Sequence, residues 1–177
     1  MKHVALLRGL NLGPHNRIKM PALVEVFERA GCRDVTTYIQ SGNVLFEASA
    51  ALLPKLPTLV AAQLEALDVR SPVVLRSAKE LQATLKKNPF LARGAAVAEL
   101  HVAFLGATPT KTAAASLDPQ RSPPDAFELV GRDLYLHFPK GVARTKLTNA
   151  YLDAKLETLS TVRNWNTVTA LAALLDG

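Results

Sequence analysis

The chain has 177 residues, of which 49% are hydrophobic and 20% charged; this suits one or two globular domains and excludes an intrinsically disordered protein. Its single cysteine, Cys32, excludes an internal disulfide and favours a reducing compartment. No apolar run approaches the ~20 residues that a membrane-spanning helix needs, and Arg8 interrupts the short apolar run at the N-terminus. We therefore expect a cytoplasmic protein without a membrane segment.

The first half of the chain predicts elements in the order β-α-β-β-α-β. Ser41 and Gly42 stand between the second and third strands and are typical of a tight hairpin turn. Apolar runs and helical spacing predict strands at 3–8, 34–40, 43–48 and 72–77, and helices at 21–30 and 51–67. This order is the split βαβ, or ferredoxin-like, plan of an antiparallel sheet with two helices on one face.

A further helix at 78–88, ended by Asn88 and Pro89, precedes a stretch that resembles a connector. The second half repeats much of the element order, although we recognise no repeat of the sequence itself. Its fourth strand has one short candidate, 160–164. The expected elements are strands at 100–106, 126–130 and 133–138, and helices at 110–117, 146–156 and 166–175.

We therefore predict an α+β protein of two ferredoxin-like halves, residues 1–90 and 91–177, with antiparallel sheets and helices packed on one face. The two halves are either separate domains or parts of one compact unit. The second half is modified at its end, because one more helix follows its last strand.

The net charge of +6 is concentrated in a small part of the sequence. Segments 8–20, 139–149 and 160–169 hold seven basic residues and no acidic one, which leaves 14 of the 21 basic residues against all 15 acidic ones elsewhere. If the three segments meet in space, this segregation favours an anionic partner. The alternative is that the basic residues line three solvated loops.

Two of the polar stretches lie in the first half. The loop 8–20 is rich in Gly and Asn, a composition that gathers donors for an anion, but it lacks both the P-loop and the dinucleotide-binding fingerprints. The hairpin tip 40–43 is also polar, and structural turns are the alternative in both places. The candidate ligand-binding residues here are Arg8, Asn11, Lys19, Gln40, Ser41 and Asn43.

The third stretch lies near the start of the helix predicted at 146–156. Its candidate residues are Arg144, Lys146 and Asn149. Cations at a helix N-terminus are unfavourable because the helix dipole is positive there, and an anion bound between them and the free N–H groups would remove this conflict. The alternative is that these side chains extend into water, where the unfavourable interaction is small.

The fourth stretch, 160–169, holds the only tryptophan, Trp165, between Asn164 and Asn166. One of these asparagines should cap the last helix. If the cap is Asn166, Trp165 precedes it as a hydrophobic staple, which we favour over stacking on a base or sugar. We expect Arg163 and the other asparagine to face an anion site shared with the basic residues at positions 8, 19 and 146.

Catalytic machinery is sparse in the sequence. The four histidines are scattered, no cluster has metal-ligand spacing, and the four polar stretches contain no acid. Cys32 has no adjacent histidine and is expected to be a buried thiol, and His15 is the one obvious general acid or base in these stretches. We therefore expect no metal and no cofactor, but a set of donors suited to phosphate or carboxylate.

The same four stretches carry a family resemblance. "ALLRGLNLG…KM", "YIQSGNVLF", "KLTN" and "RNWNTV" together resemble the bacterial family called domain of unknown function 1697. The resemblance implies a two-part α+β fold with ferredoxin-like topology, and it implies no activity. Pro14 departs from the family pattern, which has glycine there. The positions that match family motifs are Arg8, Gly9, Asn11, Lys19, Gln40, Ser41, Gly42, Asn43, Lys146, Asn149, Arg163, Asn164, Trp165 and Asn166.

Three functional hypotheses follow. The first is a protein that binds an anionic, phosphate-bearing ligand, either a small molecule such as a nucleotide or a nucleic acid. The second is an enzyme acting on a phosphorylated or carboxylated small molecule, in which Arg and Lys stabilise developing charge and His15 moves a proton. The third is that the motifs are purely structural.

Overall fold

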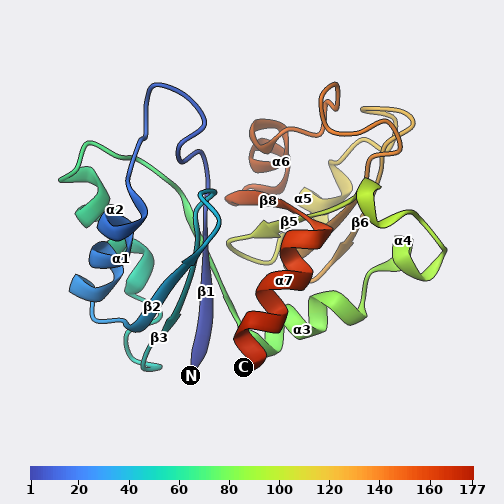
Figure 1. Cartoon of the computed structure of the whole chain (residues 1–177). Coiled ribbons are helices and arrows are strands. Elements are labelled where there is room, and N and C mark those ends of the chain that lie inside the picture. Colours follow the sequence, from blue (N-terminus) through green and yellow to red (C-terminus); the bar gives the residue numbers. More distant parts are fainter. The chain divides into compact units, whose positions relative to one another are not determined.

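All residues from 1 to 177 are described in the computed structural model, which contains two four-stranded antiparallel sheets (Figure 1). Each sheet belongs to its own unit: unit 1 comprises Met1–Glu80 and Leu171–Gly177, and unit 2 comprises Leu81–Ala170. The predicted α+β class with two ferredoxin-like halves is confirmed.

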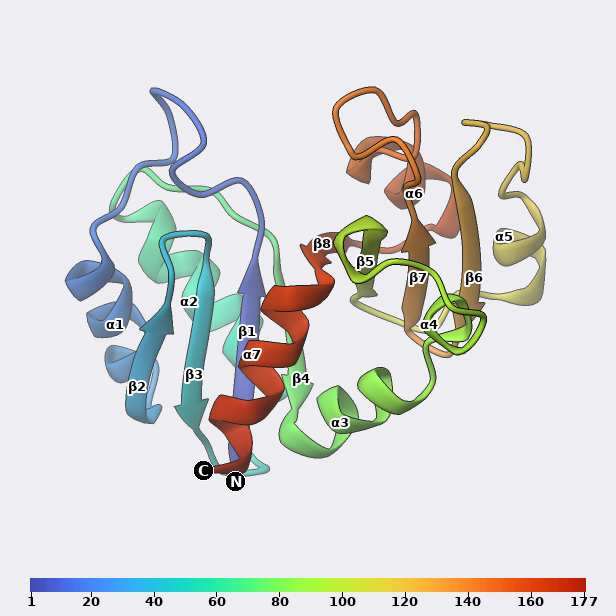
Figure 2. The same cartoon turned by 45° about the vertical axis from the view of Figure 1, so that its right-hand side comes forward.

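In unit 1 the strands follow the spatial order β2-β3-β1-β4, which can be traced in Figure 2. All neighbouring strands pair antiparallel. The elements of this part of the chain are β1 (Lys2–Leu7), α1 (Met20–Arg29), β2 (Arg33–Tyr38), β3 (Asn43–Glu47), α2 (Leu56–Glu65) and β4 (Val73–Ser77). Because β3 lies between β1 and β2, the βαβ connection through α1 is split, as the element order predicts.

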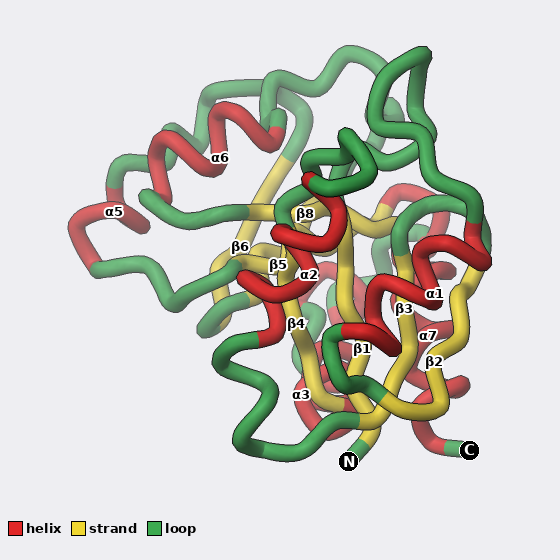
Figure 3. The backbone as a smooth tube through the Cα atoms, turned by 90° about the vertical axis from the view of Figure 1, so that its left-hand side faces the viewer, coloured by secondary structure: helices red, strands yellow, loops and turns green.

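Helices α1 and α2 lie on one face of this sheet, in front of its strands in Figure 3. Ala5 and Leu7 of β1 enter a core with Leu23 and Phe27 of α1 and with Val60 of α2. Burying a side chain of the size of leucine or phenylalanine stabilises the fold by roughly 1.5–3 kcal/mol. The period-2 alternation turns the intervening residues of β1 to the opposite face.

In unit 2 the strands follow the equivalent order β6-β7-β5-β8. Its core joins the inner residues of β5 and β7 to those of α6. The elements are β5 (Leu100–Leu105), α5 (Lys111–Ala115), β6 (Ala126–Val130), β7 (Asp133–His137), α6 (Asn149–Leu156) and β8 (Ser160–Asn164). The short candidate strand therefore exists, and it pairs antiparallel with β5 along its whole length.

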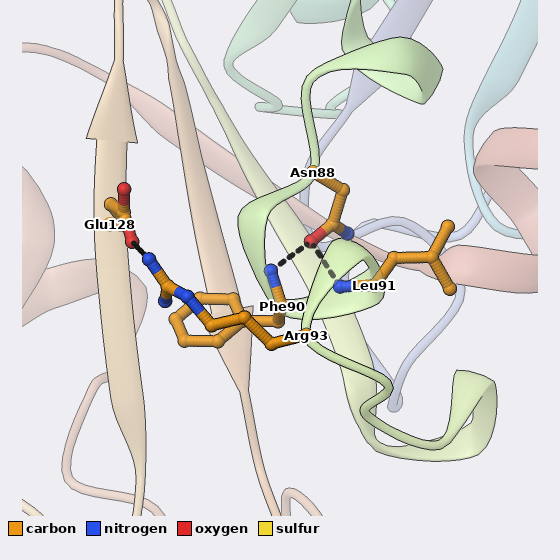
Figure 4. Close-up of polar contacts among 5 residues, drawn as sticks. All are labelled: Asn88, Phe90, Leu91, Arg93 and Glu128. Carbon is orange, nitrogen blue, oxygen red and sulfur yellow. Dashed lines mark hydrogen bonds and ion pairs between the residues drawn. The ribbon is translucent and has the colours of Figure 1, made fainter.

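The remaining elements are α3 (Ala78–Lys86), α4 (Pro89–Ala92), the 3-10 helix η1 (Val97–Glu99) and α7 (Trp165–Asp176). The predicted connector thus contains a short ordered helix, which Figure 4 shows. Asn88 Oδ1 accepts hydrogen bonds from the N–H groups of Phe90 and Leu91, at 3.0 and 3.2 Å. Arg93 then binds Glu128 of β6 at 3.1 Å, so that the turn is attached to the second sheet.

The start of α2 differs from the prediction. The helix begins at Leu56 and not at Ala51, and residues 50–55 form turns. Pro54 has no N–H to donate and disfavours helical backbone at Leu53, so the regular helix starts beyond it.

Candidate functional site

The loop after β1 is held by its own asparagines. Asn11, with φ +57°, donates from Nδ2 to the Ile18 carbonyl at 3.1 Å and accepts from the Ile18 N–H at 2.9 Å through Oδ1. Asn16 Oδ1 accepts from the N–H of Arg70 at 3.0 Å. These contacts tie the two ends of the loop to each other and to the segment before β4, and they fix the backbone that carries Arg17 and Lys19.

The hairpin tip is fixed in the same manner. Asn43 is completely buried and donates from Nδ2 to the Tyr38 carbonyl at 3.1 Å and to Ser41 Oγ at 2.9 Å. The Gly42 carbonyl accepts from the N–H of Leu7 at 2.8 Å, which joins the tip to the end of β1. Asn43 and Ser41 therefore shape the turn, and Gln40 remains exposed on it.

The loop, the start of α1 and Gln40 of the hairpin tip line one open pocket of about 740 Å³ within unit 1. Three candidate residues, Asn11, Lys19 and Gln40, line it together with four neighbours from the loop and the start of α1: Arg17, Ile18, Met20 and Pro21. The structure thus brings together residues that stand 29 positions apart in the sequence.

The pocket lies at the positive end of a helix dipole. Lys19 occupies the N-cap position of α1, no side chain caps the helix, and its first turn contains no acid. Arg17 donates from Nε to the Gly13 carbonyl at 3.0 Å, and no protein group accepts from its terminal nitrogens. The side chains of Lys19 and Gln40 make no hydrogen bond within the protein. Hydrogen-bond donors without a protein acceptor therefore gather around this pocket.

Arg8 lies at the end of β1 but is not among the lining residues. Its N–H donates to the Pro72 carbonyl at 3.1 Å, and its carbonyl accepts from Ser71 Oγ at 2.7 Å. The backbone of Arg8 thus joins β1 to the start of β4.

In unit 2, the basic stretch before α6 is attached through its backbone. Arg144 and Lys146 are exposed, and the N–H of Lys146 donates to Ser122 Oγ at 3.0 Å. Thr148 caps α6 by accepting from the N–H of Tyr151 at 3.2 Å. Asn149, the first residue of α6, accepts through Oδ1 from Ser160 Oγ of β8 at 3.2 Å. The start of this helix therefore has a cap of its own.

Arg163 is a buried residue of β8. Its Nη1 donates to Thr161 Oγ1 at 2.8 Å and to the Val162 carbonyl at 3.0 Å. Burial lowers the pKa of the guanidinium to about 10. At neutral pH the side chain is still a cation, bonded to its own strand.

The prediction of a staple at Trp165 is wrong. Asn164 Oδ1 accepts from the N–H of Thr167 at 2.8 Å, so Asn164 caps α7, and Asn166 is the exposed second residue of the helix. Trp165 is therefore the first helical residue, and its side chain is buried. The reason is that β8 runs up to Asn164, which leaves no extended residue after Trp165 to act as the cap.

The residues proposed to share one anion site belong to both units. Arg8 and Lys19 lie in unit 1, whereas Lys146 and Arg163 lie in unit 2. The pocket at α1 is formed by unit 1 alone.

The titratable groups named from the sequence lie outside this pocket. Cys32 is buried, and burial raises the pKa of its thiol to about 11, which keeps it protonated at neutral pH. His15 is exposed on the loop and is not among the lining residues. No group of three or more His, Cys, Asp or Glu side chains is placed to hold a metal ion. None of the helices has the length and apolarity that crossing a membrane requires.

A signal that our sequence analysis missed is a repeat in the strands. His3, Val4 and Ala5 of β1 recur as His101, Val102 and Ala103 of β5. In the sheets, Val4 pairs with Arg76 and Val102 pairs with Arg163, and both arginines are buried. The equivalence of the two arginines follows from these strand pairings, because each arginine lies opposite the valine of an "HVA" triplet.

Comparisons with known proteins agree with this architecture. The search of curated proteins found no match to the chain. One solved structure, described as the conserved bacterial protein SP0830 from Streptococcus pneumoniae, is 22% identical, with a TM-score of 0.69 over 98% of each chain. This structural similarity supports the fold described above. The family model described as "Protein of unknown function (DUF1697)" matches residues 1–135, and the chain therefore belongs to this family.

Proposed function

We propose that this protein binds a phosphate-bearing small molecule, such as a nucleotide, in the pocket beside the N-terminus of α1. The observation that carries the proposal is the convergence of Arg17, Lys19 and Gln40 on a space of about 740 Å³ at an uncapped helix start. Phosphate oxygens accept from guanidinium, ammonium and amide N–H groups, and charge-assisted bonds of this kind are stronger than neutral ones.

The charge of the lining favours an anion over a neutral ligand or a cation. Arg17 and Lys19 are two positions apart, and no lining residue is acidic. Both side chains are exposed to solvent, which screens their mutual repulsion to about 1 kcal/mol or less. An anion between the two side chains offsets their repulsion and also accepts from the free N–H groups of the first turn.

Binding has more support than catalysis at this pocket, because its lining contains no Asp, Glu, His or Cys to move a proton. A polynucleotide is the second candidate ligand. It is favoured by the exposed cations of the basic loop in unit 2, Arg144 and Lys146.

The test is a thermal-shift panel of inorganic phosphate, nucleoside mono-, di- and triphosphates, and short RNA and DNA. A ligand present at 100 times its Kd adds about 2.7 kcal/mol, which raises the melting temperature of a domain of this size by several degrees. The double variant Arg17→Ala/Lys19→Ala should lose the shift. The matched control, Lys55→Ala/Lys79→Ala, removes the same charge from exposed positions outside the pocket and should keep it.

The proposal is wrong if no phosphate compound stabilises the wild type, or if the Arg17→Ala/Lys19→Ala variant responds as the wild type does. A response to oligonucleotides alone, with an affinity that falls steeply as salt rises, would favour the polynucleotide over the nucleotide.

A further inference from the structure

A second cavity of unit 1, of about 420 Å³, lies on the face of the first sheet that α1 and α2 leave uncovered. It is enclosed by β2, β3 and the last turns of α7, which pass in front of this sheet in Figure 2. Its volume lies in the range of ~300–1,000 Å³ that is typical of small-molecule sites. The lining residues are Lys2, Asp34, Thr36, Thr37, Tyr38, Leu45, Phe46, Glu47, Leu174 and Leu175. We call this cavity the β2–α7 groove.

The floor of the groove is apolar. Leu45 and Leu175 are 7% and 4% exposed, whereas the ring of Phe46 packs against Phe27 of α1 in the core on the other face of the sheet. Leu174, in contrast, is 51% exposed and forms a wall. An apolar group seated beside it would remove this leucine from water, which is favourable in proportion to the area covered.

Charges of both signs lie together at one end of the groove. Glu47 of β3 pairs with Lys2 of β1 on one side and with Arg33 of β2 on the other. Asp34 follows Arg33 in β2. The three charged lining residues, Lys2, Asp34 and Glu47, therefore lie at the same end of the strands. The side chains of Lys2, Asp34 and Glu47 make no hydrogen bond and no ion pair within the protein. The groove therefore presents one free ammonium and two free carboxylates at the end of an apolar floor.

We infer that the β2–α7 groove binds a free α-amino acid with an apolar side chain. The ligand's ammonium group would lie against Glu47 and Asp34, and its carboxylate against Lys2. Its side chain would cover the leucines of the floor, and the hydroxyl groups of β2 would complete the contacts along the wall.

Other ligand classes satisfy fewer of these groups. An apolar amine leaves Lys2 without a partner, and an apolar acid leaves both carboxylates without one. An α-amino acid supplies both charges on one carbon and an apolar body beside them. This site shares no residue with the pocket at α1, and the inference does not depend on the proposed function.

The experiment is a titration of the ¹⁵N-labelled full-length protein with L-phenylalanine, followed by backbone amide shifts. Saturable shifts should be confined to Thr36, Thr37, Leu45 and Leu174, which line the groove. Phenethylamine lacks the carboxylate and 3-phenylpropanoate lacks the ammonium, so each should bind at least about tenfold more weakly than the amino acid.

Two variants test whether Glu47 and Lys2 contact the charged groups of the ligand. Glu47→Gln and Lys2→Gln each remove one charge from a side chain with no protein partner, and each should weaken L-phenylalanine binding at least about tenfold. Glu28→Gln makes the same change on an exposed residue of α1 and should leave the affinity unchanged.

The inference is overturned if L-phenylalanine produces no shift in the groove at about 10 mM. Equal affinity of either analogue for the wild-type protein would also overturn it, whether or not the two variants fold.

Discussion

At the scale of single residues, the asparagines of the family motifs divide by role. Asn11, Asn43 and Asn164 each use the side chain to satisfy backbone groups of a loop, a turn and a helix start. These side-chain hydrogen bonds are intramolecular and hold the local backbone in place. The residues left for a ligand at the α1 pocket are the long side chains of Arg17, Lys19 and Gln40.

Gly42 provides a test of how tightly the hairpin tip is held. Its φ is +77°, and an added Cβ would lie 2.9 Å from the Leu7 carbonyl oxygen, which is backbone and has little freedom to move. Gly131 stands in the equivalent turn of unit 2, with φ +61° and no atom within 4 Å of an added Cβ.

We predict that Gly131→Ala lowers the free energy of unfolding by about 1 kcal/mol, the cost of left-handed backbone for alanine. Gly42→Ala should cost about 2–3 kcal/mol, because the clash with Leu7 adds to that cost. Urea unfolding of both variants measures the difference. Equal losses would mean that the contact with β1 does not constrain the tip.

At the scale of elements, the helices begin in two different ways. Thr148 and Asn164 cap α6 and α7 with side-chain oxygens. No side chain caps α1, which starts at Met20, or α2, which starts at Leu56. Capping side chains satisfy N–H groups that a helix otherwise leaves open. The missing cap of α1 coincides with the pocket.

The cap of α7 can be tested with neighbouring residues of the same type. Asn164→Ala should lower the free energy of unfolding by about 1 kcal/mol, or roughly 2–4 °C in melting temperature. Asn166→Ala is the control, because this exposed side chain makes no hydrogen bond, and its effect should be within about 0.5 kcal/mol. The cap assignment fails if the two variants melt alike.

Lys19→Asp should separate stability from binding. An aspartate at the N-cap accepts from the first turn and suits the helix dipole, so the free energy of unfolding should rise by about 1 kcal/mol. The same change places a carboxylate in the proposed phosphate pocket and should weaken phosphate binding by more than about tenfold. Lys19→Met removes the cation without adding a cap and should weaken binding with little change in stability. Chemical denaturation and calorimetric titration measure both quantities.

Sequence patterns predicted the type and order of most elements because apolar spacing and turn residues are local signals. They even indicated the five-residue strand at 160–164. The predicted starts of α2 and α7 were wrong, because in each case a single residue determines where the helix begins. These residues are Pro54 before α2 and Asn164 before α7. Two asparagines flanked Trp165, and the choice between them depended on where β8 ends.

At the scale of the whole molecule, the two sheets share one strand order, and the "HVA" triplets and buried arginines occupy equivalent positions in both. The sequence identified three members of the α1 pocket as candidates, Asn11, Lys19 and Gln40. It did not identify the pocket itself, because the loop and the hairpin tip meet only through the pairing of β1 with β3. The β2–α7 groove depends even more on folding, since residues at opposite ends of the chain line it.

The most direct test of the proposed function is a titration of the ¹⁵N-labelled protein with a nucleoside monophosphate, read at the amides of Met20 and Ala22. These N–H groups lie in the first turn of α1, which no side chain caps. We predict saturable downfield shifts of both amides and of the Gln40 side-chain amide, lost in Arg17→Ala/Lys19→Ala. If these signals stay in place at about 10 mM ligand, or if the ligand shifts only residues outside the pocket, the assignment of a phosphate site to α1 is contradicted.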